Sequence, residues 1–485
     1  MIPTLRPDPK ANARYQNLMR LMAVAHKMEG KGWLLDRAKL EQHRKLATER
    51  VAKFSKMFLA TTKLSQSDLG ASGSGTTNKV RDWFWLSQGA PFVVFNKLTK
   101  KPQFSTEALI VYSTSKEYAK EVFSGAAAML YGLRKNKKAL EFLNVYDIFA
   151  RHDGRIHFSF NCAGAQTGRW TSSAKLRVAE DDGSRTTYSC NAQQVPKKAP
   201  KFDFGEGPEQ LVSSLRDIFI ADPGHVLIQA DFEGLELRLI AYVHGAQKIV
   251  EWIEAGADTH MSNAVRIFRE LGLPLDAKQT KPATNEMEHL ANLARDAAKP
   301  LAYAVSYQMH ASRGEDNYPT LFKTLKKIFP TITQQQANTY AARFFELHPE
   351  IRRGQTRVRK QIERDGYTEL SIDGRRLHYP STSRGQNQAL NFTMQGTGAA
   401  LVNRALLEID GQLDWQGNEV RAQVHDELVV QCRAADLDRV ADLVEAAMGR
   451  EARLGQVAAG VPALADPGLS WGTTMARAKF KEKYP

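Results

Sequence analysis

The order of apolar and polar residues along the chain predicts both helices and strands. Residues 15–64, 285–309 and 332–365 carry apolar residues at helical spacing. The segment RIHFSF (155–160) alternates as a strand does. The segment DPGHVLIQADFEG (222–234) is typical of a turn followed by a strand that ends at Asp231, and EGLELRLIAYVHG (233–245) is typical of a helix. This mixture predicts an α+β fold.

Four segments add detail to this pattern. GYTELSIDGRRLHYP (366–380) predicts a hairpin with Asp373-Gly374 as its turn. ALNFTMQGTGAALVNRALLEI (389–409) predicts a loop that leads into a helix, and the polar, charged segment 174–190 predicts a loop. NEVRAQVHDELVVQCR (418–433) predicts two short strands that meet near His425 and Asp426.

The triplet His425-Asp426-Glu427 interrupts an otherwise apolar stretch. Inside a strand, Asp426 and Glu427 would point to opposite faces. One carboxylate would then be buried without a partner, which costs several kcal/mol. A hairpin tip avoids this cost and lets the side chains face a cleft, although an ordinary surface turn would avoid it as well.

A second aspartate, Asp231, also stands where an apolar strand ends. If the two strands are neighbours, Asp231 and Asp426 converge, and their charges repel unless cations hold them together. Two Mg²⁺ ions about 4 Å apart would do so, and such a pair stabilises in-line phosphoryl transfer. Aspartates at strand ends are common, so this pair by itself only suggests a metal site.

A third feature is the segment RDAAKPLAYAVSYQ (295–308), in which Arg295, Lys299, Tyr303 and Tyr307 follow one another at four-residue spacing. On a helix each step of four residues drifts by roughly 40°, so the four side chains share a stripe about 18 Å long. Two cations followed by two aromatic rings match the phosphates, sugar and base of a nucleoside triphosphate. The alternative is an amphipathic helix with a solvated basic end.

Composition narrows the function further. The chain has 485 residues, enough for about two to four domains. Its 67 Lys and Arg against 53 Asp and Glu give a net charge of +14, which favours a nucleic-acid partner over a merely basic protein. Three widely spaced cysteines argue against a zinc site or a disulfide framework, and we expect a reducing, cytoplasmic compartment. The apolar stretches are too short to span a membrane, and the N-terminus shows no secretory signal.

With these motifs in order, the chain resembles the family A DNA polymerases, the group of bacterial DNA polymerase I and the small tailed-phage replicases. DFEGLELR (231–238), RDAAKPLAYAVSY (295–307) and VHDELV (424–429) resemble its motifs A, B and C. QTGRWTSS (166–173) and NAQQVP (191–196) resemble its template-primer loops, and DTH (258–260) follows motif A as in the family. The matches run from about Met28 to Trp471.

The resemblance implies a right-hand fold and a template-directed 5′–3′ DNA polymerase that adds dNTPs to a primer by two-metal-ion nucleotidyl transfer. It implies that Asp231, Asp426 and the Phe232 carbonyl hold two Mg²⁺ ions, with Mn²⁺ as a substitute. It further implies that the catalytic residues are Asp231, Asp426, Glu427 and Lys299, with Lys299 donating a proton to pyrophosphate. The implied dNTP-binding residues are Arg295, Lys299, Tyr303, Tyr307, Glu236 and His260. The implied DNA-binding residues are Arg169, Gln193, Arg216, Asn391, Gln395 and His425.

Within this set, Glu236 is expected to pair with Tyr303 and to crowd the 2′-hydroxyl of a ribonucleotide. Tyr303, where many relatives have Phe, implies acceptance of dideoxynucleotides. Motif A has Glu233-Gly234 where bacterial relatives carry Ser-Gln, and its Gly-Leu-Glu-Leu-Arg (234–238) is closer to the phage form, which favours phage-type replication. Pro300 predicts a kink after Lys299; if the helix instead begins at Pro300, the four-residue stripe is broken.

The expected domains are a helical lead-in (1–36), a thumb (37–150), a first palm segment with motif A (151–245), fingers with motif B (246–365) and a second palm segment with motif C (366–485). No room is left for a proofreading exonuclease, so a separate exonuclease subunit or a processivity factor is an open question. The alternatives are a single-subunit RNA polymerase, which a Glu236 gate would block, and a non-catalytic nucleic-acid clamp, which would need none of the acidic and basic motif residues.

Overall fold

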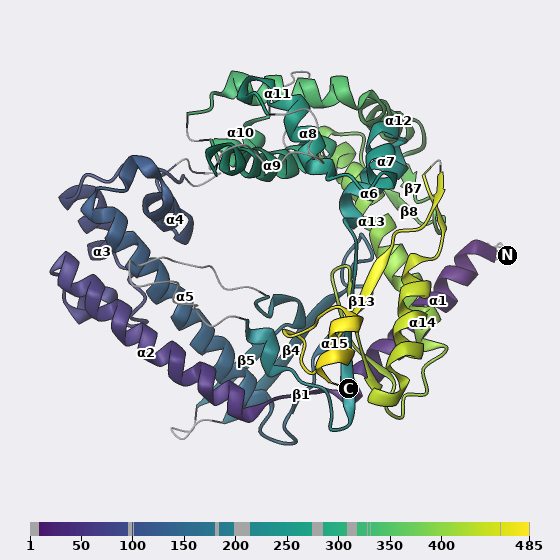
Figure 1. Cartoon of the computed structure of the whole chain (residues 1–485), viewed down its shortest axis with the longest axis horizontal. Helices are drawn as coiled ribbons and strands as arrows, with labels where there is room; N and C mark the ends of the chain where they lie inside the picture. Colours follow the sequence, from purple (N-terminus) through teal and green to yellow (C-terminus); the bar gives the residue numbers. More distant parts are fainter. Residues whose placement is uncertain are drawn as a thin grey trace, which may run out of the picture.

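The structure is a computed structural model. It describes residues 9–95, 99, 101–179, 184–197, 214–273, 285–307, 318–326, 328–329, 331–455 and 457–484. Its helices and strands form three groups arranged as a C (Figure 1). One end of the C is formed by α2–α5, the other end by α7–α12, and a four-stranded sheet with its covering helices lies between them.

The central sheet is antiparallel, with strand order β13-β6-β10-β9. Its strands are β6 (His225–Phe232), β9 (Glu419–Val424), β10 (Glu427–Arg433) and β13 (Ala463–Gly468). Alternate residues of β6, including Val226, Ile228 and Ala230, are buried on the face that α13 (Ser383–Asp410) and α14 (Leu437–Gly449) cover. The other face carries the fully buried Leu227 and then Gln229 and Asp231, so it becomes polar toward the end of the strand.

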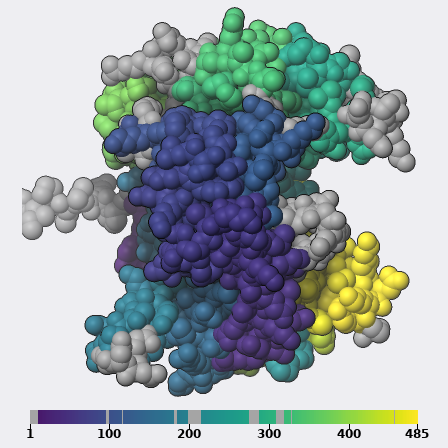
Figure 2. All heavy atoms as spheres, turned by 90° about the vertical axis from the view of Figure 1, so that its left-hand side faces the viewer, coloured from purple at the N-terminus to yellow at the C-terminus, as the bar shows by residue number. Residues whose placement is uncertain are grey.

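The segment 37–150 is built on two long helices, α2 (Arg37–Thr62) and α5 (Val122–Phe149), which pack along each other. The shorter helices α3 (Asn78–Asp82) and α4 (Thr106–Thr114) cap their far end. A hydrophobic core of its own fills this end, with Phe54, Phe58 and Leu130 at its centre. In Figure 2 this purple and blue segment forms the front of the molecule, below the green segment that contains α10–α12.

The segment 246–365 is helical in its described parts. It contains α7 (Gln247–Glu254), α8 (Thr259–Ile267), α9 (Asn285–Ser306), α10 (Pro319–Lys326), α11 (Gln334–Leu347) and α12 (Pro349–Asp365). Helices α8, α10 and α11 all pack against α9. Helix α9 continues through Pro300, so the expected helix is not interrupted there and does not begin there.

The remaining elements connect these groups. Helix α1 (Pro9–Lys31) packs on α13, and β1 (Trp33–Leu34) pairs with β2 (Arg155–Ile156). The others are β3 (Ser159–Asn161), β4 (Thr171–Ala179), β5 (Arg185–Cys190), α6 (Leu235–His244), β7 (Tyr367–Glu369), β8 (Arg376–His378), β11 (Ala452–Leu454), β12 (Val457–Ala459) and α15 (Arg477–Lys483). The three cysteines are buried and unpaired. Among the described residues, no helix is long and apolar enough to cross a membrane.

Several expectations are confirmed: the strand that ends near Asp231, the helix after it, the hairpin at 366–380 and the two strands that meet at His425. Two are wrong. Segment 174–190 is not a loop but the antiparallel pair β4–β5, since its Thr, Val and Tyr residues favour strands. Segment 389–409 does not begin with a loop, because α13 already starts at Ser383 behind the N-cap Thr382, whose hydroxyl accepts from the Gly385 amide. The helical segments 15–64 and 332–365 are each divided in two, at β1 and at His348.

Candidate active site

The strand register brings the acidic residues of the two distant motifs together. Asp231 lies near the end of β6, directly opposite Glu427, the first residue of β10. Opposed residues in an antiparallel pair have Cα atoms about 5 Å apart. Asp426 lies in the two-residue turn between β9 and β10, beside Glu427. This tight turn needs a left-handed residue, and His425 takes that conformation with φ of 59°.

The electrostatic environment of Asp231 shows that these carboxylates interact. Burial, and then the negative charge of Asp426, raise the pKa of Asp231 to about 6, with Glu427 adding to the rise and Lys197 opposing it. One carboxylate oxygen of Asp231, Oδ1, is buried without a hydrogen-bond partner. A buried, unpaired carboxylate oxygen beside a second carboxylate is an arrangement that a cation would stabilise.

Glu427 is held in place by groups other than a metal. Arg216 Nη1 donates to its two carboxylate oxygens at 3.2 and 3.0 Å, and the indole of Trp471 donates at 2.5 Å. The Arg216 guanidinium also stacks on the Trp471 ring, 3.9 Å from its centroid. Arg216 is therefore only 6% exposed, and its predicted contact with DNA stays a prediction.

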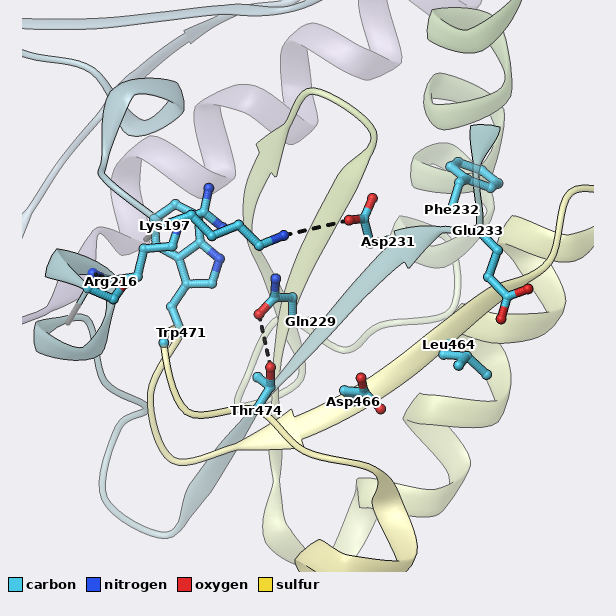
Figure 3. Close-up of a pocket in the computed structure, with 12 residues that line it drawn as sticks. Lys197, Arg216, Gln229, Asp231, Phe232, Glu233, Leu464, Asp466, Trp471 and Thr474 are labelled. Atoms are coloured by element: carbon cyan, nitrogen blue, oxygen red, sulfur yellow. Dashed lines mark hydrogen bonds and ion pairs between the residues drawn. The ribbon is translucent and has the colours of Figure 1, made fainter. Parts of the chain in front are cut away.

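A cavity of about 480 Å³ opens beside Asp231, between β6, β13 and the segment that ends at Lys197 (Figure 3). The ammonium group of Lys197 points into this cavity, 3.7 Å from Asp231 Oδ2 and 3.6 Å from Glu427 Oε2. Gln229 and Asp466 line the same cavity, and Thr474 donates a hydrogen bond to Gln229 at 3.1 Å.

The donors in this region suit a divalent cation such as Mg²⁺, which prefers carboxylate and carbonyl oxygens. Asp231, Asp426 and the backbone of Phe232 supply such oxygens. No group of three or more His, Cys, Asp or Glu side chains in the described residues is placed to hold a metal by itself. This agrees with the geometry, because Glu427 is occupied by Arg216 and Trp471. A metal here would depend on two aspartates, backbone and other ligands.

Motif B lies on α9, which carries three residues of the expected stripe, Arg295, Lys299 and Tyr303. Arg295 Nε donates to Asp258 Oδ2 at 2.5 Å, and Asp258 is the N-cap of α8. The Tyr303 ring meets the His260 ring edge-on, with centroids 5.9 Å apart. Burial lowers the pKa of His260 to about 4, and the cations Lys299 and Arg295 contribute. Lys299 is exposed and has no ion pair within the described part of the chain.

The expected pairing of Glu236 with Tyr303 is wrong in this structure. Tyr307, which follows the last residue of α9, donates its hydroxyl to Glu236 Oε1 at 2.5 Å. Tyr307 is buried, and burial together with the Glu236 charge raises the pKa of its hydroxyl. Glu236 still raises the pKa of Tyr303, after burial, so all three side chains lie near one another. Tyr307, the fourth residue of the stripe, therefore contacts Glu236 of motif A.

The residues predicted to bind DNA lie on several elements. Asn391 and Gln395 are one turn apart on α13 and half-buried, while His425 and Arg169 are exposed. Gln193 donates from Nε2 to the Trp170 carbonyl at 2.8 Å. The positive charge of Arg169 acts on Tyr307, so the loop 166–170 faces motif B. Their contacts with DNA stay predictions.

Three residues of the site were not among those predicted from the sequence: Lys197, Asp258 and Arg375. Lys197 contacts Asp231, and Asp258 accepts from Arg295. Arg375 donates to the Thr167 carbonyl at 2.8 Å and to the Gly396 carbonyl at 3.3 Å, and so fixes the loop 166–170 onto α13. Gly168, with φ of 77°, leaves room for this guanidinium, because a Cβ there would lie 2.0 Å from it. The positions of Lys197 and Arg375 next to family-like motifs were the only available signal.

Comparisons with known proteins agree with this geometry. A family model described as DNA polymerase family A matches residues 91–472. The thermostable DNA polymerase I of Thermus aquaticus is 27% identical over 310 residues, which is 62% of this chain and 31% of that protein. DNA polymerase I of Pseudomonas aeruginosa is 27% identical over 311 residues, which is 62% of this chain and 28% of that protein. The chain therefore spans about a third of the length that these curated relatives have.

A solved structure shares the fold. The POL domain of Pol1 from M. smegmatis, in complex with DNA primer-template and dNTP, matches with a TM-score of 0.69 and 20% identity. The match covers 94% of this chain and 70% of that chain. It confirms the expected α+β right-hand fold with thumb, palm and fingers, while the boundaries expected between these parts stay predictions.

Proposed function

We propose, since this chain belongs to DNA polymerase family A, that it extends the 3′ end of a primer with dNTPs under the direction of a DNA template. The proposed domains are those expected from the sequence, with 37–150 as the thumb, 246–365 as the fingers and the rest of the described chain mainly as the palm. The form of motif A supports phage-type replication as the setting, and a bacterial or phage-infected cytoplasm as the place.

The observation that carries this proposal is the meeting of Asp231 and Asp426. Their elements are almost two hundred residues apart in the sequence, and adjacent strands bring them together. Burial, followed by the negative charge of Asp426, raises the pKa of Asp231 to about 6, so the two carboxylates lie close enough to interact. Carboxylates whose pKa is perturbed by burial and by a neighbouring charge, beside an open cavity, are typical of functional sites.

Members of this family use divalent metal ions, and the proposed ions here are two Mg²⁺, with Mn²⁺ as a substitute. Asp231, Asp426 and the Phe232 carbonyl would hold them. Bound ions of this kind activate the attacking 3′-oxygen and neutralise charge on the leaving pyrophosphate. Glu427 would lie beside the ions without binding them, because its carboxylate oxygens accept from Arg216 and Trp471.

The nucleotide would bind along the stripe of α9. Lys299 has a free ammonium to donate to the phosphates, and it is the proposed proton donor to pyrophosphate. Arg295 is paired with Asp258, so it must leave or share this partner to reach a phosphate. Exchange of that ion pair for a phosphate contact would accompany rotation of the fingers toward the palm, which commits the correct nucleotide.

Selection against ribonucleotides would rest on Glu236. Its carboxylate accepts from Tyr307 and lies near Tyr303, on which the sugar would pack. A 2′-hydroxyl entering this space would displace the tyrosine hydroxyl without regaining all of its hydrogen bonds. Tyr303 supports the further proposal that dideoxynucleotides are accepted.

The primed DNA would bind in the C-shaped space between thumb, palm and fingers, through Arg169, Gln193, Asn391, Gln395 and His425. Arg216 would join them only if it leaves Glu427. The net charge of +14 supports a polyanionic partner, because neutralising phosphates releases counterions.

The test is primer extension by the wild type, Asp231→Asn and Asp426→Asn, with primed DNA, each dNTP and Mg²⁺. Both variants should fold and bind primed DNA but extend on the order of 10³-fold more slowly, because each loses a metal-holding carboxylate. Asp466→Asn is the matched control, since Asp466 lines the same cavity but is not a proposed ligand. Normal extension by either variant would contradict the proposal.

Two further arms of this assay separate the alternatives. Preferred incorporation of rNTPs would indicate an RNA polymerase, and DNA binding without any extension by the wild type would indicate a clamp. Near-total exclusion of a dideoxynucleotide would contradict the role given to Tyr303.

A further inference from the structure

Lys197 is placed unusually for a residue next to proposed metal ligands. Its ammonium lies 3.7 Å from Asp231 Oδ2 and 3.6 Å from Glu427 Oε2, so that one cation bridges the ends of β6 and β10. Figure 3 shows its side chain extended across the cavity toward Asp231. Its position is defined by the backbone before it: Arg216 donates to the Val195 carbonyl at 3.4 Å, and Ser214 donates to the Pro196 carbonyl at 3.2 Å.

The two carboxylates that Lys197 bridges differ in their other partners. Glu427 also has Arg216 and Trp471, so its charge is compensated without Lys197. For Asp231, Lys197 is the only ion-pair partner among the described residues, and Asp231 Oδ1 has no hydrogen bond at all. The lysine therefore matters most to the residue that is proposed to hold the metal.

We propose that Lys197 is a positioning residue of the metal centre, whose ammonium neutralises Asp231 in the metal-free protein until a divalent ion, held by Asp231 and Asp426, displaces it. This inference rests on the proposed function. The lysine keeps the carboxylates in position in the metal-free protein, because it reduces the repulsion between them. Its long, half-exposed side chain can then turn away, because only 3.6–3.7 Å contacts hold it.

The proposal has a measurable consequence: Lys197 competes with the metal. Removing its charge removes both the competing ion pair and the repulsion between an ammonium and a divalent ion. Lys197→Gln should therefore bind divalent ions more tightly, by roughly three- to tenfold for one charge at this distance in a partly hydrated site. Lys197→Arg keeps the charge and should bind them as the wild type does.

The experiment is a titration of the full chain with Mn²⁺, followed by electron paramagnetic resonance of the free ion, without DNA or nucleotide and at fixed ionic strength. Lys479→Gln is the matched control, because Lys479 is an exposed lysine on α15, outside the cavity. The double variant Lys197→Gln/Asp231→Asn should show no tightening, because the competition acts through Asp231. Melting followed by circular dichroism checks that each variant is folded.

The possible results are distinct. Tighter Mn²⁺ binding by Lys197→Gln alone supports the proposal, whereas unchanged or weaker binding overturns it. If the wild type shows no Mn²⁺ binding that Asp231→Asn removes, the metal role in the proposed function fails, and this inference fails with it. If that binding is present but Lys197→Gln equals the wild type, only the role of Lys197 is lost. As a second readout, the Mg²⁺ concentration for half-maximal primer extension should fall by the same factor in Lys197→Gln.

Discussion

Burial and the charge of Asp426 disfavour the charged form of Asp231 in the metal-free protein, and this gives the protein's stability a defined pH dependence. The pKa of Asp231 is about 6 in the folded chain, because of burial and of Asp426, against 3.8 for the free side chain. Between these values the folded state binds more protons than the unfolded state, so stability falls as pH rises from about 4 to 6. Asp231→Asn lacks this loss. In EDTA, we expect the difference in melting temperature between Asp231→Asn and the wild type to grow from about pH 4 to 6 and to stay constant above that range.

Asp222 is a control, because its pKa is shifted in the opposite direction and removing its charge should lower stability. Burial would raise its pKa, but the Arg421 and Arg155 guanidiniums and a Gln431 hydrogen bond outweigh burial and lower it. Asp222→Asn should therefore lose stability relative to the wild type near neutral pH. The prediction for Asp231 is wrong if Asp231→Asn in EDTA melts no higher than the wild type at pH 7. The charged form of Asp231 would then not destabilise the folded protein.

The hydrogen bond between Tyr307 and Glu236 makes a prediction about sugar selection. Glu236→Ala removes the carboxylate that a ribose would have to displace, so the preference for dNTP over rNTP in kcat/KM should fall about 100-fold. Glu233→Ala is the control, because Glu233 pairs with Arg238 and lies outside this contact. An unchanged preference in Glu236→Ala would exclude Glu236 as the gate.

The site residues that could be predicted are those whose role is visible locally. Asp231 and Asp426 stand at strand ends. Lys299, Tyr303 and Tyr307 follow one another at four-residue spacing. Partners set by tertiary packing could not be found in this way. The hydrogen bond of Tyr307, rather than Tyr303, to Glu236 depends on how the end of α9 packs against α6. The contact of Lys197 with Asp231 depends on a segment that Arg216 and Ser214 fix from another part of the chain.

At the level of elements, α9 shows how packing decides between two sequence interpretations. Pro300 lacks an amide hydrogen and crowds the preceding turn, which costs about 3 kcal/mol in a helix interior. The helix nevertheless continues, because α9 buries a stripe of small and branched side chains against its neighbours: Ala294, Ala297, Ala298, Leu301, Ala302 and Val305. The sequence left both outcomes open, since the local cost is known but the burial that offsets it is not.

The strand pair β4–β5 was predicted as a loop, and its residues now suggest a use. Directly opposed residues share a face, so Lys175 opposite Ser189, Arg177 opposite Thr187 and Arg185 opposite Ala179 place three exposed cations on one side. None of the three has an ion pair within the described residues. Replacing all three by Gln should lower the slope of log K against log salt for duplex binding by about 2 to 3, at roughly 0.9 for each phosphate contact.

The control for this prediction changes net charge equally at another place. Lys248, Lys479 and Lys483 are exposed lysines on α7 and α15, and replacing them by Gln should leave the slope nearly unchanged. Residues 180–182 are acidic and lie outside the described residues. An unchanged slope in the β4–β5 variant would mean that the cations of this strand pair do not neutralise DNA phosphates.

At the scale of the whole molecule, the segment 37–150, the proposed thumb, contains a core of its own. Phe54, Phe58 and Leu130 lie in a cluster separate from the larger one, which spans the central sheet, the helices of 246–365 and α1. The helices α2 and α5 join the two, because Leu40 and Leu143, toward their other ends, lie in the larger core. A defect at the far end of α2 and α5 should therefore leave the proposed metal site at Asp231 intact.

Phe58→Ala tests this division. Phe58 is fully buried, and its truncation should cost about 3–5 kcal/mol of local stability. We expect faster hydrogen exchange in 54–133 and weaker binding of primed DNA, since the thumb would no longer hold the duplex, but unchanged Mn²⁺ binding at Asp231. Phe344→Ala, equally buried but in the larger core on α11, should instead speed exchange in the fingers. Loss of Mn²⁺ binding in Phe58→Ala would show that thumb and palm fold as one cooperative unit, and the two cores would then have to be treated as a single one.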